Sequence, residues 1–415
     1  MMEKLSFRKN FLWIFGGTGF FNACQWFSMV AMARICQPEQ VGQFSLAVAL
    51  CSPIILMSGM NLRMAIVSDF SADYKFIHYL RLRIFSGVIS VLLIAILCLW
   101  CKYDTYLVLM ILTITIEKLF LDVATVYYGK FQLNERMDLI SKSYTVRGGA
   151  GVILFVLLLL MSKNILLAVA GRAIISITAL FFFEIPKSRI FKNETPLIFK
   201  RNTYSLFKKV FPLGVVMGIM SLKTNIPRYF IAEYCGEDML GYFTAINVLL
   251  IAIHMPVHAL SETALARLSK YFNSDMNQYI KLFRKLILMT LLIGIFLVVG
   301  TSLFGEVFIT LIYKSDYARY WQVLFIGSIG TVFGFIVSMA SAAFIVTRKF
   351  KMQMFIYLIV LLVTLICSYI LIPRYGIIGA SWVNVISSLI HSIMFGFAIS
   401  IASYKGRADL RFQNK

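Results

Sequence analysis

The stretch TNIPRYFIAEYCGEDMLGYF (Thr224–Phe243) carries a proline and several charged residues next to strongly apolar sequence. It also repeats an earlier part of the chain. At an offset of 199 residues, MARICQPEQVGQFSLAVAL (Met32–Leu50) aligns with IAEYCGEDMLGYFTAINVL (Ile231–Leu249), with five identities. Both copies are predicted to contain the turn between the first and second membrane-spanning helices of their half. We therefore interpret the chain as two repeated halves.

The composition predicts a protein embedded in a lipid bilayer. Of the 415 residues, 60% are hydrophobic, including 36 Phe and 20 Met, whereas soluble domains average roughly 45–50% apolar residues. Runs of about twenty apolar residues match the hydrocarbon thickness of a membrane. The sequence therefore predicts an all-α integral membrane protein with twelve transmembrane helices. The predicted spans are residues 11–33, 41–60, 84–101, 105–129, 144–161, 164–184, 211–231, 240–266, 283–303, 320–346, 352–373 and 376–403.

The predicted spans form two groups of six. We predict an N-terminal six-helix bundle in residues 1–184, a basic cytoplasmic linker in 185–210 and a C-terminal six-helix bundle in 211–415. Because each half has an even number of spans, both halves enter the membrane in the same orientation, which makes a parallel repeat about an axis along the membrane normal. Two such pseudo-symmetric bundles are expected to enclose a central cleft, where transporters commonly bind substrate.

Small residues in the first and seventh spans predict close contacts between helices. Gly16, Gly17 and Gly19 lie in the first span, and Gly214 and Gly218 have G-x-x-x-G spacing in the seventh. Such residues let helix backbones approach one another in a membrane. Helix packing is therefore favoured for them over direct contact with a substrate.

The net charge of +21 admits two explanations, a nucleic-acid partner or membrane topology. With the N-terminus in the cytoplasm, the inner segments and their edges carry 30 of the 40 Lys and Arg residues, and the outer segments carry six. Cytoplasmic loops of membrane proteins are enriched in Lys and Arg. Topology therefore explains the charge, with both termini cytoplasmic, and no nucleic-acid partner is predicted.

Ionisable residues inside the spans are the candidates for function, because each costs about 2.5–3.5 kcal/mol at a helix centre. They are Glu117, Lys118, Asp122, Arg172, Lys223 and Arg228. Lys118 and Asp122 are four residues apart, so the sequence predicts that they pair along one helix face. For Arg172, and for Arg147 and Glu262 near span ends, the alternative is a side chain that reaches along its helix to the interface.

The seventh span has two cations and no acidic residue. Lys223 and Arg228 lie on either side of Pro227, which removes a backbone donor and clashes with the carbonyl of the residue four positions earlier. A helix kinked at this depth is tolerated against protein or a water-filled cavity. Guanidinium and ammonium groups bind phosphate, so the pattern favours a cavity that receives an anion, with Pro227 as a hinge. The alternative is a purely structural kink.

Polar and aromatic residues of the same spans are candidates for contact with a sugar. They are Asn22, Gln25 and Trp26 in the first span and Asn225, next to Thr224, in the seventh. Each offers hydrogen bonds or a stacking surface. The alternative for every one of them is ordinary packing between helices.

No pattern in the chain predicts catalysis or a metal site. The best metal-like spacing is His254, His258 and Glu262, yet eight residues of helix rise about 12 Å, too far for three side chains to reach one ion. Pro256 also disturbs that helix. The glycine-rich phosphate loop of an ATPase is absent from the sequence. We therefore expect a transporter without cofactors rather than an enzyme, driven by an ion gradient, the membrane potential or consumption of the product.

Four stretches carry a resemblance to a known family. They are FGGTGFFNACQW in the first span, PEQVGQFSLAVALCSPIILMSGMNLRMAIVSD through the second, and NIPRYFIAEYCGEDMLGYFTAINVLL and ALARLSKYF in the second half. Together with the order of the spans, they resemble the O-antigen flippases, in the polysaccharide-export branch of the multidrug/oligosaccharidyl-lipid/polysaccharide exporter superfamily.

The resemblance implies a function. It implies flipping of an undecaprenyl-diphosphate-linked oligosaccharide from the cytoplasmic to the outer leaflet of a bacterial inner membrane, through a cationic cavity that opens alternately to each side. Its partners are then the lipid-linked oligosaccharide, membrane lipids, and a polysaccharide polymerase and chain-length regulator. The alternatives are a drug/cation antiporter of the same fold and a scaffold for polysaccharide assembly that transports nothing.

The resemblance also assigns residues. Arg63 in MNLRMAIVSD and Arg228 in NIPRYF match the family pattern and are implied to bind the headgroup. The predicted headgroup role of Lys118, Arg172 and Lys223 depends on their charge alone. Ion coupling, as in some relatives, is implied for Glu117 or Asp122.

Overall fold

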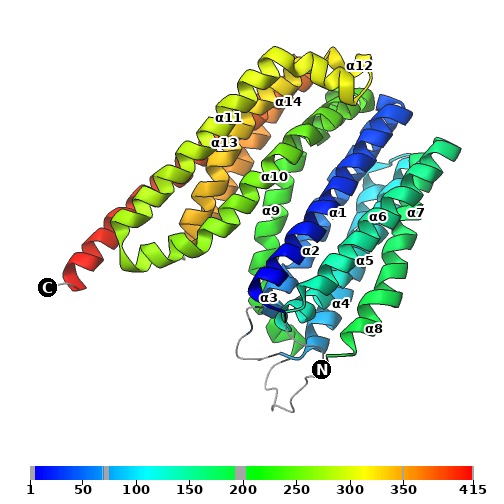
Figure 1. Ribbon diagram of the computed structural model, residues 1–415. Coiled ribbons are helices and arrows are strands. Elements are labelled where there is room, and N and C mark those ends of the chain that lie inside the picture. Colours follow the sequence, from blue (N-terminus) through cyan, green and yellow to red (C-terminus); the bar gives the residue numbers. More distant parts are fainter. Residues whose placement is uncertain (1–4, 68, 70–73, 192–201, 348–349, 414–415) are drawn as a thin grey trace. The chain divides into compact units, whose positions relative to one another are not determined.

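A computed structural model describes residues 5–67, 69, 74–191, 202–347 and 350–413 (Figure 1). Within these ranges the chain forms helices and no strand. Nine of the described helices are long and apolar enough to cross a membrane. The predicted fold class, an all-α multi-pass membrane protein, is confirmed, while the count of twelve spans stays a prediction.

The chain divides into two compact units, Met1–Leu222 and Lys223–Lys415. The helices of the first unit are α1 (Phe7–Ile35), α2 (Pro38–Gly59), α3 (Leu62–Val67), α4 (Phe76–Cys101), α5 (Thr105–Leu133), α6 (Met137–Ser162), α7 (Ile165–Ala179), the π-helical turn η1 (Leu180–Glu184) and α8 (Ile185–Ser188). Helix α9 (Thr203–Cys235) begins in the first unit and ends in the second. The second unit continues with α10 (Glu237–Ser274), α11 (Met276–Ile312), α12 (Ser315–Ala318), α13 (Trp321–Ile345) and α14 (Phe350–Gln413). Residues 192–201 of the predicted linker lie outside the described residues, and the predicted domain boundaries stay predictions.

The helix boundaries follow the repeat seen in the sequence. Helix α1 ends at Ile35 and α2 begins at Pro38, where the missing amide N–H of proline leaves no helical hydrogen bond unmade. In the second copy α9 ends at Cys235 and α10 begins at Glu237, which is 199 residues after Pro38. A turn of one or two residues therefore joins the first two helices at the same place in each copy.

Two predicted spans lie within the single long helix α14. Gly376, which follows Pro373 by three residues, has φ 58° and ψ −138°, outside the helical region. Glycine adopts positive φ without the steric penalty of other residues. The helix is therefore interrupted at the point where the sequence predicts one span to end and the next to begin.

Helix packing within each unit accounts for the core. In the first unit α1 packs on α6, α6 on α7, and α5 contacts α2, α3, α4 and α7. In the second unit α13 contacts α10, α11 and α14. Helix α5 thus lies at the centre of the first unit, and it carries three of the charged residues predicted to be functional.

The predicted packing role of the glycines is confirmed at three positions. A Cβ on Gly17 would collide with Ser141 of α6, and one on Gly214 with the carbonyl oxygen of Met57 in α2. A Cβ on Gly218 would lie 3.1 Å from the Met57 Cβ. Gly16 and Gly19 face open space, with nothing within 4 Å of an added Cβ, so the packing interpretation does not apply to them.

This difference predicts opposite effects of the same substitution. Gly214→Ala should lower the stability of the purified protein by about 1–3 kcal/mol, because the backbone of α9 must move away from α2. Gly16→Ala should raise it by about 0.5–1 kcal/mol, because alanine favours the helix and meets no neighbour. Thermal unfolding in detergent measures both, and equal melting temperatures for the two variants would contradict this packing.

Candidate functional site

Arg172 of α7, one of the predicted headgroup residues of the first unit, is neutralised by Glu117 of α5. Its Nε lies 2.6 Å from Glu117 Oε1, and its Nη2 donates to Oε2 at 2.9 Å. Arg172 Nη1 also donates to Gln25 Oε1 of α1 at 3.0 Å, and the guanidinium lies over the Phe155 ring. The alternative of a side chain reaching to the interface is wrong for Arg172, because its partners are on neighbouring helices. The hydrogen bond from Arg172 therefore fixes the position of the Gln25 side chain.

The predicted pairing of Lys118 with Asp122 is wrong. Asp122 forms its ion pair with Arg83 of α4. Lys118 Nζ instead donates to the Ser52 hydroxyl of α2 at 3.1 Å. Helices α4 and α2 bring partners to these side chains from outside α5, and those partners replace the contact along the helix.

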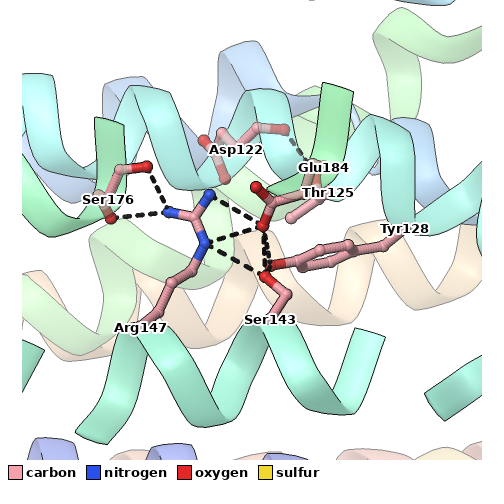
Figure 2. A network of polar contacts seen from close by, with 7 residues as sticks. All are labelled: Asp122, Thr125, Tyr128, Ser143, Arg147, Ser176 and Glu184. Atoms are coloured by element: carbon pink, nitrogen blue, oxygen red, sulfur yellow. Dashed lines mark hydrogen bonds and ion pairs between the residues drawn. The ribbon is translucent and has the colours of Figure 1, made fainter. Parts of the chain in front are cut away.

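A third ion pair, between Arg147 of α6 and Glu184 at the end of η1, is almost completely buried (Figure 2). The two side chains are 2% and 0% exposed, and Arg147 Nη2 lies 3.1 Å from Glu184 Oε1. Arg147 Nη1 donates to both the carbonyl and the hydroxyl oxygen of Ser176 at 2.9 Å. Ser143 Oγ donates to Glu184 Oε1, and the Tyr128 hydroxyl lies 2.6 Å from the Ser143 hydroxyl.

Sequence reasoning missed this network. Arg147 was expected to reach to the interface, and that interpretation is wrong because its guanidinium is buried among α6, α7 and η1. Glu184 was not selected, since it ends a predicted span and has no cation within one helical turn on its N-terminal side. The π-helical turn Leu180–Glu184 that carries it is a rare distortion, often found at functional positions. The side chain of Glu262, the other residue with this alternative, lies outside the described residues.

Arg63 contacts a neutral side chain, and the polar residues Asn22 and Trp26 of α1 are half-buried. Arg63 Nε of α3 donates to Gln132 Oε1 of α5 at 3.0 Å, so its partner there is neutral. The Trp26 Nε1 has no hydrogen-bond partner among the described residues. The contact with the neutral Gln132 therefore leaves the positive charge of Arg63 uncompensated.

The two cations of α9 have no acidic partner in the described part of the chain. Arg228 Nη1 donates to Asn225 Oδ1 at 2.9 Å, and Asn225 is 4% exposed. Lys223 is half-buried, near the imidazole of His391 in α14. Helix α9 continues without interruption through Pro227, and the hinge role of Pro227 stays a prediction.

Seven of the arginines and lysines described above fall into two groups according to their contacts. Arg83, Arg147 and Arg172 each contact a carboxylate. Arg63, Lys118, Lys223 and Arg228 contact no carboxylate in the part of the chain that the structure describes. No group of three or more His, Cys, Asp or Glu side chains in that part is arranged to hold a metal ion. The site chemistry is therefore that of cations and neutral polar groups within a membrane protein.

Comparison with known proteins identifies the family. The family described as polysaccharide biosynthesis protein matches residues 7–272, more than half of the chain. The chain belongs to the polysaccharide biosynthesis protein family. Within the curated proteins, this family member is 26% identical over 393 residues to the capsular polysaccharide biosynthesis protein CapF of Staphylococcus aureus, covering 93% of this chain and 98% of CapF.

Solved structures show the fold of this polysaccharide biosynthesis protein. The lipid II flippase MurJ in an inward closed conformation matches with a TM-score of 0.73 and 16% identity, over 94% of this chain and 90% of MurJ. An inward-facing multidrug resistance transporter of the MATE family and MOP superfamily matches with a TM-score of 0.65 and 14% identity, over 97% of each chain. The predicted resemblance to proteins of polysaccharide biosynthesis is confirmed by the family match, and these solved structures show the fold that the chain shares with them.

Proposed function

We propose that this protein is a flippase for an undecaprenyl-diphosphate-linked oligosaccharide, the repeat unit of an O-antigen or a similar surface polysaccharide. It would move this substrate from the cytoplasmic to the outer leaflet of a bacterial inner membrane by alternating access, with both termini in the cytoplasm. Family membership and the likeness to a capsular polysaccharide biosynthesis protein support the polysaccharide part of this proposal. The fold shared with a lipid II flippase supports the lipid-linked part.

The observation that carries the proposal is the pair of cations in α9 without acidic partners. Lys223 and Arg228 lie in an apolar helix, and neither forms an ion pair with any described residue. A charge in a membrane helix is expensive unless it is paired or serves a substrate pathway. A diphosphate headgroup supplies the missing negative charge, with charge-assisted hydrogen bonds to guanidinium and ammonium groups.

The contacts sharpen the roles proposed for the other residues. In the second unit we assign headgroup binding to Arg228 and Lys223, whose contacts among the described residues include no carboxylate. In the first unit the same holds for Arg63 and Lys118, and their role toward a headgroup stays part of the proposal. Arg172 is neutralised by Glu117, so its role is to hold Gln25 toward the sugar. The remaining polar residues, Asn22, Trp26 and Asn225, are proposed to contact the oligosaccharide.

Ion coupling by Glu117 or Asp122 stays part of the proposal, in a form that the ion pairs restrict. Each carboxylate already contacts an arginine, so a coupling cation would have to compete with a guanidinium. Transport then requires no covalent step, enzyme activity or cofactor. The proposed partners are the lipid-linked substrate, membrane lipids, and a polysaccharide polymerase and chain-length regulator.

Reconstitution tests the function directly. Liposomes with the purified protein and a fluorescent undecaprenyl-diphosphate oligosaccharide should expose inner-leaflet substrate to an external quencher faster than protein-free liposomes. Liposomes with the double variant Lys223→Gln/Arg228→Gln serve as the matched control and should show a rate close to the protein-free one. Equal rates with and without the wild-type protein would rule out the flippase.

The second candidate is a drug/cation antiporter, which the fold shared with multidrug transporters favours. Such antiporters take cationic substrates, and the uncompensated Lys223 and Arg228 would repel them. Dye resistance conferred on a pump-deficient cell, without any effect on surface polysaccharide, would support the antiporter. A scaffold that transports nothing predicts instead that neutralising these two residues leaves surface polysaccharide intact.

A further inference from the structure

A buried arginine in the first unit has hydrogen-bond donors that nothing in the described chain satisfies. Arg83 of α4 is 2% exposed, and its Nη2 pairs with Asp122 of α5. Its Nε and Nη1 are buried and have no hydrogen-bond partner among the described residues. A buried donor without an acceptor costs about 1–3 kcal/mol, and more for a charged group. A bound water or ion is one way in which such a group is satisfied in native proteins.

The side chains around Arg83 leave a positive charge. Lys118, one helical turn before Asp122 on α5, acts electrostatically on the Asp122 carboxylate. Its Nζ donates to Ser52 Oγ, whose own proton goes to the carbonyl oxygen of Val48 at 2.6 Å. The cluster of Arg83, Lys118 and Asp122 therefore holds two positive charges and one negative charge. The nearby Glu117 does not change this balance, because its carboxylate pairs with Arg172 of α7.

The last residue of α2, Gly59, lies next to the unsatisfied guanidinium nitrogen. A Cβ added to Gly59 would lie 3.4 Å from Arg83 Nη1. Glycine at this position thus lets backbone and guanidinium approach without an intervening side chain. A small ligand beside Arg83 Nη1 would accept hydrogen bonds from Arg83. The cluster of Arg83, Lys118 and Asp122 around it has a net charge of one positive unit.

We propose that the Arg83 cluster between α2, α4 and α5 binds one small monovalent anion of chloride size. One such anion makes the cluster neutral and accepts hydrogen bonds from Arg83 Nε and Nη1. The positive charges of Arg83 and Lys118 favour an anion over a cation in the conformation described, and a water molecule would leave the charge uncompensated in a medium of low dielectric constant. A lipid phosphate is too large for a guanidinium that is 2% exposed. The site goes beyond the proposed transport function, since it lies within one unit and stabilises it.

Chloride dependence of thermal unfolding tests the site. The purified full-length protein is melted in detergent with sodium chloride replaced stepwise by sodium gluconate, whose anion is too large to be buried. A ligand present at about ten times its dissociation constant for the folded state should raise the melting temperature by about 1–2 °C. Arg83→Gln should abolish this shift. Arg81→Gln, which removes an exposed cation two residues earlier on the same helix, should keep it.

A second variant keeps the proposal testable if Arg83→Gln does not fold. Asp122→Asn raises the charge of the cluster by one unit, so it should bind chloride at least about threefold more tightly. The proposal is overturned if the wild-type melting temperature is the same in chloride and gluconate, which means that water fills the site. It is also overturned if Asp122→Asn binds chloride no more tightly than wild type, or if anionic lipid rather than chloride restores stability.

Discussion

Replacing Arg228 by alanine is expected to reduce surface display of the polysaccharide at least about tenfold, with no loss of protein from the membrane. The guanidinium has the neutral Asn225 as a hydrogen-bond partner and no carboxylate among the described residues. Removing it therefore breaks no ion pair there, and it relieves an insertion cost of about 2.5–3.5 kcal/mol at most. The headgroup in turn loses hydrogen bonds to a charged group, each of which contributes about 1.5–3 kcal/mol. That loss corresponds to roughly ten- to hundredfold in affinity.

The measurement compares surface glycan per cell with the amount of protein in the membrane fraction. A strain lacking the gene is complemented with wild type, Arg228→Ala, Arg228→Lys or Arg374→Ala. Arg228→Lys should retain partial display, because it keeps the charge and loses the planar fork of donors. Arg374→Ala removes an exposed arginine of the same unit and should behave as wild type. Normal display by Arg228→Ala at normal abundance would disprove the headgroup role of this residue.

Replacing Glu184 by alanine is expected to destabilise the protein by about 3–5 kcal/mol, because it leaves Arg147 charged and buried without its anion. The corresponding fall in melting temperature is about 3–6 °C. The loss should exceed the mere absence of an attraction, since Ser143 and Tyr128 also lose the acceptor at the centre of their network. Melting of purified protein in detergent, and the yield of folded protein from membranes, measure the effect.

Two controls separate this effect from general sensitivity to mutation. The double variant Arg147→Met/Glu184→Leu removes both charges and should recover most of the lost stability, because well-packed apolar residues can replace a buried ion pair. Lys142→Ala removes a cation that is 54% exposed and lies 4.0 Å from Asp138. Its effect should stay below about 1 kcal/mol. A Glu184→Ala variant that melts like wild type would show that Arg147 reaches water or another anion.

Particular residues show how far the sequence could predict the site. The surplus of cations in the seventh span was visible, because no acidic residue occurs between Leu213 and Ile231. The partner of Asp122 was not, because Arg83 is 39 positions away along the chain and a lysine stands four positions away. Glu184 was missed in the same way, since it lies 37 positions from Arg147. Local spacing predicts a contact along one helix, and a contact from a neighbouring helix replaces it.

The sequence by itself determined that this protein crosses a membrane many times, where the short turn between the first two helices of each copy lies, and which residues place charge in the bilayer. These properties depend on hydrocarbon thickness, on the energy of inserting each segment and on local turn chemistry, all of which act on consecutive residues. Only the tertiary structure decided which charges are neutralised, because an ion pair forms where side chains from different helices converge. The packing of α5 against α2, α4 and α7 selected Arg83 and Arg172 as the partners of its carboxylates.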